Sequence, residues 1–302
     1  MPLPIDDILP ALRSALATHG RAVLQAPPGA GKTTGVPPAL LDQVTGRIVM
    51  LEPRRLAARA AAERMADVMG QPVGQTVGYR IRGEAAVSEA TRIEVVTEGI
   101  LTRMIQDQPD LPDVGLVIFD EFHERSLNAD LGLALTWELR QALRPDLGVL
   151  VMSATLDAEP VATMLDAAPL LTSQGRAFPV ETRHLDRPLP RDQRLEDAVA
   201  AQVLTAMADV PGGCLVFLPG EGEIRRVAAR LTGALPGDVA LHTLFGAMKI
   251  EDQRAAIRPA AKGRKLVLAT AIAETSLTIE DVRIVIDAGR ARRARFDPAS
   301  GM

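Results

Sequence analysis

Cysteine and aromatic residues are scarce in this sequence, which has one cysteine in 302 residues and an aromatic content of 3%. A single cysteine excludes an intramolecular disulfide framework and a cysteine-based metal site. Cys214 begins the apolar run 214–218, which predicts that it is a core residue. The four histidines show no spacing typical of a metal site. The chemistry therefore has to come from other side chains.

Long apolar runs and a strong charge of one sign are also missing. No stretch of about 18 apolar residues and no basic segment followed by an apolar one occurs, so we expect a cytoplasmic protein without a membrane partner. The net charge of −4 provides no overall attraction for nucleic acid. Binding to RNA or DNA would need a local groove with suitably placed donors. The length and the 47% hydrophobic content are enough for two domains of about 150 residues each.

A glycine-containing loop at residues 25–34 is the most informative stretch that is present. It reads Gln-Ala-Pro-Pro-Gly-Ala-Gly-Lys-Thr-Thr and follows a short apolar run. Gly29 and Gly31 allow the backbone to bend so that several N–H groups point at one anion. Lys32 adds a positive charge at a helix N-terminus, and Thr33 offers a hydroxyl to Mg²⁺.

The match to the phosphate-binding pattern G-x-x-x-x-G-K-[ST] is incomplete, because Ala26 occupies the position of the first glycine. Taken alone, the loop is also compatible with an ordinary glycine-rich turn. We predict that the following residues bind the phosphates of a nucleotide: Pro28, Gly29, Ala30, Gly31, Lys32, Thr33 and Thr34.

Short apolar strands alternate with helical segments in the first half of the chain. This alternation predicts a parallel sheet covered by helices on both faces. Ligands of such sheets bind at the carboxyl ends of the strands. The expected strands are 22–24, 47–51, 92–96, 115–119 and 147–152. Polar residues follow them at Lys32, Arg54, Thr97, Asp120 and Ser153.

The second half repeats the α/β pattern without a second glycine loop that carries a lysine. A glycine- and proline-containing segment at 171–191 predicts the crossover between two domains. Further strands are expected at 214–218, 265–269 and 283–287. We place the first domain at residues 1–172 and the second at 173–302.

Two adjacent carboxylates, Asp120 and Glu121, follow the expected strand 115–119. At the end of a buried strand such a pair is costly unless a positive group is held there, and Mg²⁺ with a triphosphate fits. We predict that Asp120 and Thr33 bind Mg²⁺, and that Glu121 orients and deprotonates the attacking water. The alternative is an acidic helix N-terminus stabilised by the helix dipole.

Ser153 and Thr155 follow the last strand of the first half. As an isolated feature, this segment is typical of a helix cap. Its position beyond the acidic pair suggests a second hypothesis, in which the hydroxyl groups contact His123 and report the state of the nucleotide.

These stretches belong to a set of seven that occurs in the order and spacing of a known family: 29–34, 53–57, 97–99, 120–123, 153–155, 215–220 and 269–279. The chain resembles the DEAH-box superfamily 2 helicases. The variants Asp-Glu-Phe-His and Ala-Pro-Pro-Gly are similar to those of the bacterial HrpB-type ATP-dependent RNA helicases. Seven motifs in order are far more specific than any one of them.

The resemblance implies two RecA-like domains of the P-loop NTPase class, each an α/β fold with a parallel sheet, the second of them incomplete. It implies that ATP or another NTP binds with Mg²⁺ between the domains, and that single-stranded RNA, or DNA, lies across both. Arg54, Thr97 and Thr270 match the residues that hold the nucleic-acid backbone, and Ser276 matches a nucleotide contact. The resemblance also implies that Lys32 and His123 take part in catalysis together with the acidic pair. It implies that Ser153 and Thr155 couple hydrolysis to motion.

The sequence departs from the family pattern at two places. Ala271 replaces an asparagine, and the motif that supplies arginine fingers does not occur before Met302. An arginine finger is typically worth about 10³ to 10⁵ in rate. We therefore expect an N-terminal fragment of a helicase that turns over weakly by itself.

Three functions remain open at this point. The first is an ATP-hydrolysing RNA helicase core. The second is a DNA-directed translocase, because backbone contacts do not distinguish the two nucleic acids and the 2′-hydroxyl contact is not visible in a sequence. The third is a nucleotide-gated binding module without productive hydrolysis. The biological substrate and protein partners are not encoded in these motifs.

Overall fold

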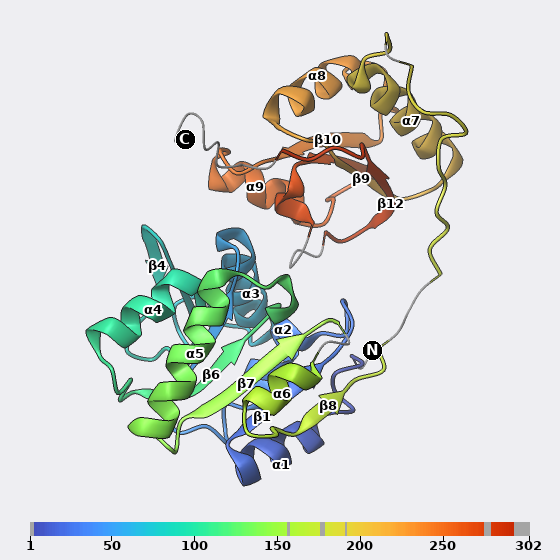
Figure 1. The fold of residues 1–302 in the computed structure, drawn as a ribbon. Helices are drawn as coiled ribbons and strands as arrows, with labels where there is room; N and C mark the ends of the chain where they lie inside the picture. The colour runs from blue at the N-terminus through green and yellow to red at the C-terminus, as the bar shows by residue number, and fades with distance from the viewer. Residues whose placement is uncertain (1–2, 156–157, 176–178, 191, 275–278, 293–302) are drawn as a thin grey trace, which may run out of the picture. The chain divides into compact units, whose positions relative to one another are not determined.

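The structure is a computed structural model that describes residues 3–155, 158–175, 179–190, 192–274 and 279–292. The chain divides into two compact units, Met1–Val180 and Glu181–Met302. Each unit has its own sheet and its own helices (Figure 1).

The first unit contains a sheet of eight strands within the described residues, in the order β4-β3-β5-β2-β6-β7-β1-β8. The short β3–β4 hairpin is antiparallel, whereas the other neighbouring strands are parallel. The strands are β1 (Arg21–Gln25), β2 (Arg47–Glu52), β3 (Val77–Ile81), β4 (Glu84–Ala86), β5 (Ile93–Thr97), β6 (Val114–Phe119), β7 (Gly148–Ser153) and β8 (Leu170–Thr172).

Helices cover both faces of this sheet, as the continuous apolar strands require. In β2, Met50 packs into a core cluster with α1, α2 and α3, whereas Val49 and Leu51 pack into a second cluster with α4, α5 and α6. Successive residues of a strand thus face opposite layers. The helices are α1 (Leu9–His19), α2 (Lys32–Ala39), α3 (Arg55–Val68), α4 (Glu98–Asp107), α5 (Leu127–Ala142) and α6 (Glu159–Met164).

The second unit has four parallel strands in the described residues, in the order β10-β11-β9-β12. Helices α7 and α8 pack on one face around a single core cluster. The elements are α7 (Leu195–Asp209), β9 (Gly213–Phe217), α8 (Glu221–Leu231), β10 (Val239–Leu244), α9 (Ile250–Ile257), β11 (Arg264–Ala269) and β12 (Val282–Asp287). Short 3₁₀ turns, η1 (Phe122–Glu124) and η2 (Ala271–Ala273), follow β6 and β11.

Four strands were not predicted from the sequence: β3, β4, β8 and β10. The β3–β4 hairpin carries charged residues on an exposed edge, and β10 contains His242 and Thr243 in a half-buried edge position. The helix that begins at Lys32 is short, with eight residues, and ends directly after Pro37 and Pro38. The prediction of an α/β fold with parallel sheets is confirmed.

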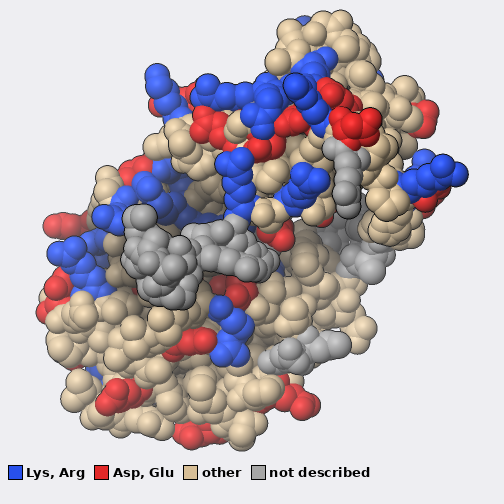
Figure 2. All heavy atoms as spheres, turned by 45° about the horizontal axis from the view of Figure 1, so that its top comes forward, with Lys and Arg blue, Asp and Glu red and all other residues tan. Residues whose placement is uncertain are grey.

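Figure 2 shows small groups of basic and acidic side chains interspersed on the visible face. None of the helices within the described residues has the length and apolar content that crossing a bilayer requires. Binding to a polyanion would therefore depend on individual basic side chains and hydrogen-bond donors.

The start of β6 generates a prediction about stability. A Cβ atom at Gly115 would lie 1.9 Å from the Thr45 carbonyl oxygen, which belongs to the backbone of the neighbouring turn. We expect Gly115→Ala to lower the free energy of unfolding by about 3 kcal/mol and the unfolding temperature by roughly 6–12 °C. Thermal unfolding followed by circular dichroism measures both.

Gly99→Ala is the matched control, because a Cβ atom there has no neighbour within 4 Å. Gly99 lies in α4, where alanine is favoured over glycine by up to about 1 kcal/mol. Equal unfolding temperatures for the two variants would contradict the close packing at Gly115.

Candidate active site

The loop between β1 and α2 contains the residues predicted to bind phosphate. Gly29 and Gly31 have φ angles of 78° and 90°, a region that glycine adopts without strain. Gly31 is the N-cap of α2, which begins at Lys32. The free N–H groups of the first turn of α2 therefore lie beside the loop, and this arrangement favours an anion.

The alanine that interrupts the glycine pattern has a structural explanation. Ala26 is fully buried in the core cluster of α1, α2 and α3, and its N–H donates to the Ser153 carbonyl at 2.9 Å. The left-handed conformations occur at Gly29 and Gly31, and Ala26 does not have a positive φ. The loop therefore does not need a glycine at this position.

Two contacts join the loop to the acidic pair. Lys32 Nζ lies 3.1 Å from Glu121 Oε1, and Thr33 Oγ1 donates to Asp120 Oδ2 at 2.5 Å. Lys32 and Asp120 are only 4% and 5% exposed. The structure thus brings residues from β6 and α2, almost 90 positions apart in the sequence, into one buried cluster.

Glu121 is held in an unusual backbone conformation. Its φ and ψ are 49° and 34°, in the left-handed region that disfavours a residue with a Cβ atom. Its N–H donates to Asp120 Oδ1 at 2.8 Å. Burial, followed by the Asp120 carboxylate, raises the pKa of Glu121 above its usual range. A carboxyl group with raised proton affinity is suited to general-base chemistry.

A third carboxyl group belongs to this cluster and was missed in the sequence. Glu52, the last residue of β2, is completely buried, and neither of its carboxyl oxygens has a hydrogen-bond partner in the described residues. Burial, followed by the neighbouring Asp120, raises the pKa of Glu52 well above its usual range. The signal was a glutamate that ends an otherwise apolar strand, beside the strand that directly precedes Asp120.

The residues present fit a divalent cation. Lys32 provides one ammonium group, whereas Glu52, Asp120 and Glu121 provide three buried or largely buried carboxyl groups. Thr33 and Asp120 place two hard oxygen atoms side by side, and these are the residues that would hold Mg²⁺. The described residues contain no cluster of three His, Cys, Asp or Glu suited to a metal. Mg²⁺ does not require one, since phosphates and waters complete its shell.

His123 connects the acidic pair to the segment after β7. The Ala154 N–H donates to His123 Nδ1 at 3.3 Å, and the same nitrogen lies 3.3 Å from Glu121 Oε2. Ser153 Oγ instead accepts the N–H of the exposed Thr155 at 3.3 Å. In this structure the segment 153–155 therefore contacts His123 through a backbone amide. The sequence had led us to expect this contact from the hydroxyl groups.

Arg54 and Thr97 lie at the ends of neighbouring strands. Glu52 of β2 is in register with Thr97 of β5, and Arg54 and Thr97 are the N-cap residues of α3 and α4. Arg54 also approaches the acidic segment, with its Nη2 atom 3.4 Å from Glu124 Oε2. The carboxyl ends of the strands thus carry both the residues predicted to bind nucleotide and the residues predicted to bind nucleic acid.

The remaining predicted residues belong to the second unit. Thr270 follows β11, and its N–H donates to the Leu244 carbonyl at 3.1 Å. Ser276, predicted to contact the nucleotide, lies outside the described residues.

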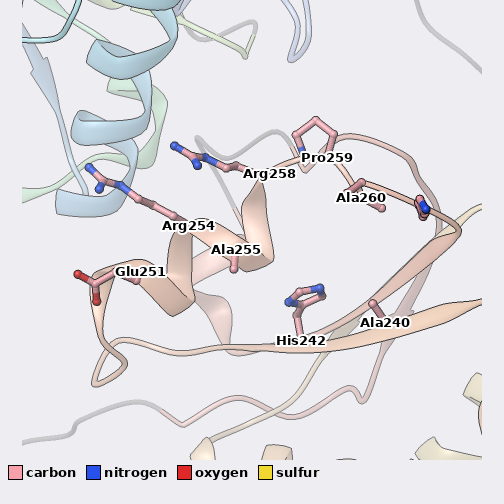
Figure 3. Close-up of a pocket in the computed structure, with 10 residues that line it drawn as sticks. Ala240, His242, Glu251, Arg254, Ala255, Arg258, Pro259 and Ala260 are labelled. Atoms are coloured by element: carbon pink, nitrogen blue, oxygen red, sulfur yellow. The ribbon is translucent and has the colours of Figure 1, made fainter.

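A cavity of about 560 Å³ in the second unit lies next to α9 and β10 (Figure 3). His242 of β10 points into it, while the side chains of Arg254 and Arg258 extend away from His242. Burial, followed by the charge of Lys265, lowers the pKa of His242. The cavity is lined by none of the predicted site residues, and its polar groups do not converge as those of ligand sites do.

Comparison with known proteins agrees with the geometry. The chain is 53% identical to the ATP-dependent RNA helicase HrpB of Escherichia coli (strain K12), over 99% of this chain and 37% of that protein. It is 34% identical to the ATP-dependent RNA helicase HrpA homolog of Haemophilus influenzae, over 97% of this chain and 23% of that protein. The chain therefore spans less than two fifths of either relative.

The fold is similar to that of a crystal structure of the Escherichia coli DEAH/RHA helicase HrpB. The TM-score is 0.91 at 52% identity, over 100% of this chain and 39% of that chain. Residues 9–164, which are more than half of the chain, match the DEAD/DEAH box helicase family. The chain belongs to the DEAD/DEAH box helicase family.

Proposed function

We propose that this chain is the nucleotide-hydrolysing core of an RNA helicase, which binds ATP with Mg²⁺ and couples hydrolysis to movement along single-stranded RNA. The observation that carries this proposal is the pair of contacts from Lys32 and Thr33 to Glu121 and Asp120. They unite a phosphate-binding loop and an acidic pair in one buried site. The similarity to ATP-dependent RNA helicases supports the same function.

The loop and α2 bind and orient the phosphates. Lys32 exchanges its Glu121 partner for phosphate oxygens, and the N–H groups at the start of α2 hold the same anion. Thr33 and Asp120 would hold Mg²⁺, which would supply positive charge to offset the charge of the phosphates. Loss of the Lys32 contact leaves the Glu121 carboxylate available to accept a proton from the attacking water. His123, 3.3 Å from Glu121, positions that carboxylate.

The neighbouring strand ends bind the nucleic acid. Arg54 and Thr97 offer a guanidinium and a hydroxyl beside the nucleotide residues, and Thr270 offers a hydroxyl in the second unit. Contacts of this kind hold a phosphate backbone without reading its sequence. The contact between Ala154 and His123 links the acidic pair to β7, which supports a coupling role for the segment 153–155.

The two compact units support the assignment of an ATP-binding domain, proposed at 1–172, and a second helicase domain, proposed at 173–302, although the units themselves divide at Val180. The free, buried Cys214 is compatible with the reducing cytoplasm in which we place this function.

The decisive experiment compares ATP hydrolysis, with and without single-stranded RNA, by this chain and by a longer protein that includes the family's arginine motif. RNA-stimulated turnover by the longer protein supports the helicase core. If both proteins bind ATP and neither hydrolyses it, the helicase proposal fails and nucleotide-gated binding takes its place. Competition between matched RNA and DNA strands then identifies the nucleic acid.

The acidic pair generates the first prediction of this function. Glu121→Gln keeps the size of the side chain and removes the proton acceptor, so we expect turnover of the longer protein to fall by at least about 100-fold. Binding of a fluorescent ATP analogue should remain within a few-fold of the original. Turnover equal to that of the unmodified protein would remove Glu121 from the mechanism. Glu138→Gln, at an exposed position of α5, is the control.

The second prediction concerns the nucleic-acid edge. Arg54→Ala should weaken binding of single-stranded RNA for all sequences alike, and reduce the slope of log K against log salt by about 0.7. Fluorescence anisotropy at several salt concentrations measures both. Arg103→Ala is the matched control, because Arg103 is 79% exposed and pairs with Asp107 on α4. An equal loss in the two variants would indicate a nonspecific charge effect.

A further inference from the structure

Glu52 is a buried acid that neither the sequence motifs nor the similarity to helicases explains. Its side chain is completely buried at the carboxyl end of β2. Both of its oxygen atoms lack a hydrogen-bond partner in the described residues. The neighbouring Asp120 can pair with Glu52 only when one of the two carboxyl groups carries a proton. With both groups ionised, the buried oxygens of Glu52 need a donor from outside the chain, such as water.

The local backbone fixes the direction of this side chain. Residues alternate along a strand, so Glu52 lies on the same face of the sheet as Met50, two positions earlier. Met50 and Ile118 belong to the core cluster of α1, α2 and α3, and Asp120 follows Ile118 by two positions. Glu52 and Asp120 therefore face the same layer, which contains α2.

The register of the sheet then brings Glu52 to the catalytic group. Leu51 of β2 is paired with Phe119 of β6, and the Asp120 N–H donates to the Leu51 carbonyl at 3.0 Å. Glu52 and Asp120 are therefore side by side. Pro53, which follows, favours an extended backbone at Glu52 and keeps it in the strand.

A second buried glutamate in the same sheet shows how the charge of a structural acid is offset. Glu94 of β5 is also completely buried, and its Oε2 likewise has no hydrogen-bond partner in the described residues. Its Oε1 accepts from Arg80 Nε at 2.7 Å, however, and its Oε2 lies 3.6 Å from Arg47 Nη1, so two arginines offset its charge. Among the described residues, no arginine forms an ion pair with Glu52. The charged groups that act on its pKa are Asp120, Glu121 and Lys32, all of them site residues.

We propose that Glu52 is a positioning residue of the nucleotide site, whose carboxyl oxygens hold water of the Mg²⁺ hydration shell beside Asp120. Mg²⁺ gives up its water reluctantly and is bound through few protein oxygens, so acceptors for its waters determine how firmly it is held. This inference rests on the proposed nucleotide function. Under this proposal Glu52 acts through water and Asp120, and it touches no reacting atom.

The experiment measures the Mg²⁺ dependence of binding, without turnover. A fluorescent, non-hydrolysable ATP analogue is titrated into the 302-residue chain in EDTA and at increasing Mg²⁺. For Glu52→Gln we expect the half-saturating Mg²⁺ concentration to rise about tenfold, while affinity for the analogue in EDTA stays within twofold. Glu52→Leu, which has no acceptor, should show at least the same rise.

Glu94→Gln is the matched control. It should leave the Mg²⁺ dependence unchanged and lower the unfolding temperature, because it weakens the pairing with Arg80 and Arg47. Glu52→Gln without Mg²⁺ should unfold no earlier than the original chain, since its amide can donate to Asp120.

The outcomes separate the two proposals. A wild-type Mg²⁺ dependence in both Glu52 variants overturns the role of Glu52 and leaves the nucleotide site standing. Failure of the unmodified chain to bind the analogue with Mg²⁺ overturns the proposed function, and the role of Glu52 with it.

Discussion

The buried cluster of one ammonium group and three carboxyl groups is the constraint on which the candidate site of the first unit depends. Lys32 contacts Glu121, and Asp120 and Glu52 lie beside them, where water is largely excluded. Unbalanced negative charge in such a place is unfavourable unless a cation or proton offsets it. The cluster therefore fits the Mg²⁺ and phosphates that we propose as its ligands.

The parallel sheet makes this cluster possible. Parallel strands bring their carboxyl ends to one edge, so Glu52, Asp120 and Ser153 come together although they are far apart in the chain. Apolar residues on both faces fix the register, since a shift of one position would exchange the two core clusters. The identity of the last residue in each strand can then change the chemistry without changing the fold. At β2, that residue is Glu52.

Much of this arrangement can be predicted from the sequence, because buried parallel strands are short, apolar and bounded by polar residues. The strand that precedes Asp120 and the strand that ends in Ser153 were located to within one residue. The β3–β4 hairpin and β10 were missed because charged or polar residues on edge strands weaken the apolar pattern. Glu52 was overlooked because its importance comes from a neighbour across the sheet. The link from Ala154 to His123 uses a backbone N–H, which every residue except proline possesses and no motif can reveal.

The second unit shows why a buried lysine alone does not make a nucleotide site. Lys265 is 1% exposed, and its Nζ donates to the carbonyl oxygens of Ala256, Ile257 and Arg258 at 3.4, 3.2 and 2.8 Å. Its charge is thus used at the C-terminus of α9, where the helix dipole favours a cation. Lys32 lies at the opposite end of a helix, where the dipole disfavours its charge, and it is held there by Glu121. An anion bound beside the start of α2 would relieve that conflict, which supports our proposal that Lys32 binds phosphate, whereas Lys265 caps a helix.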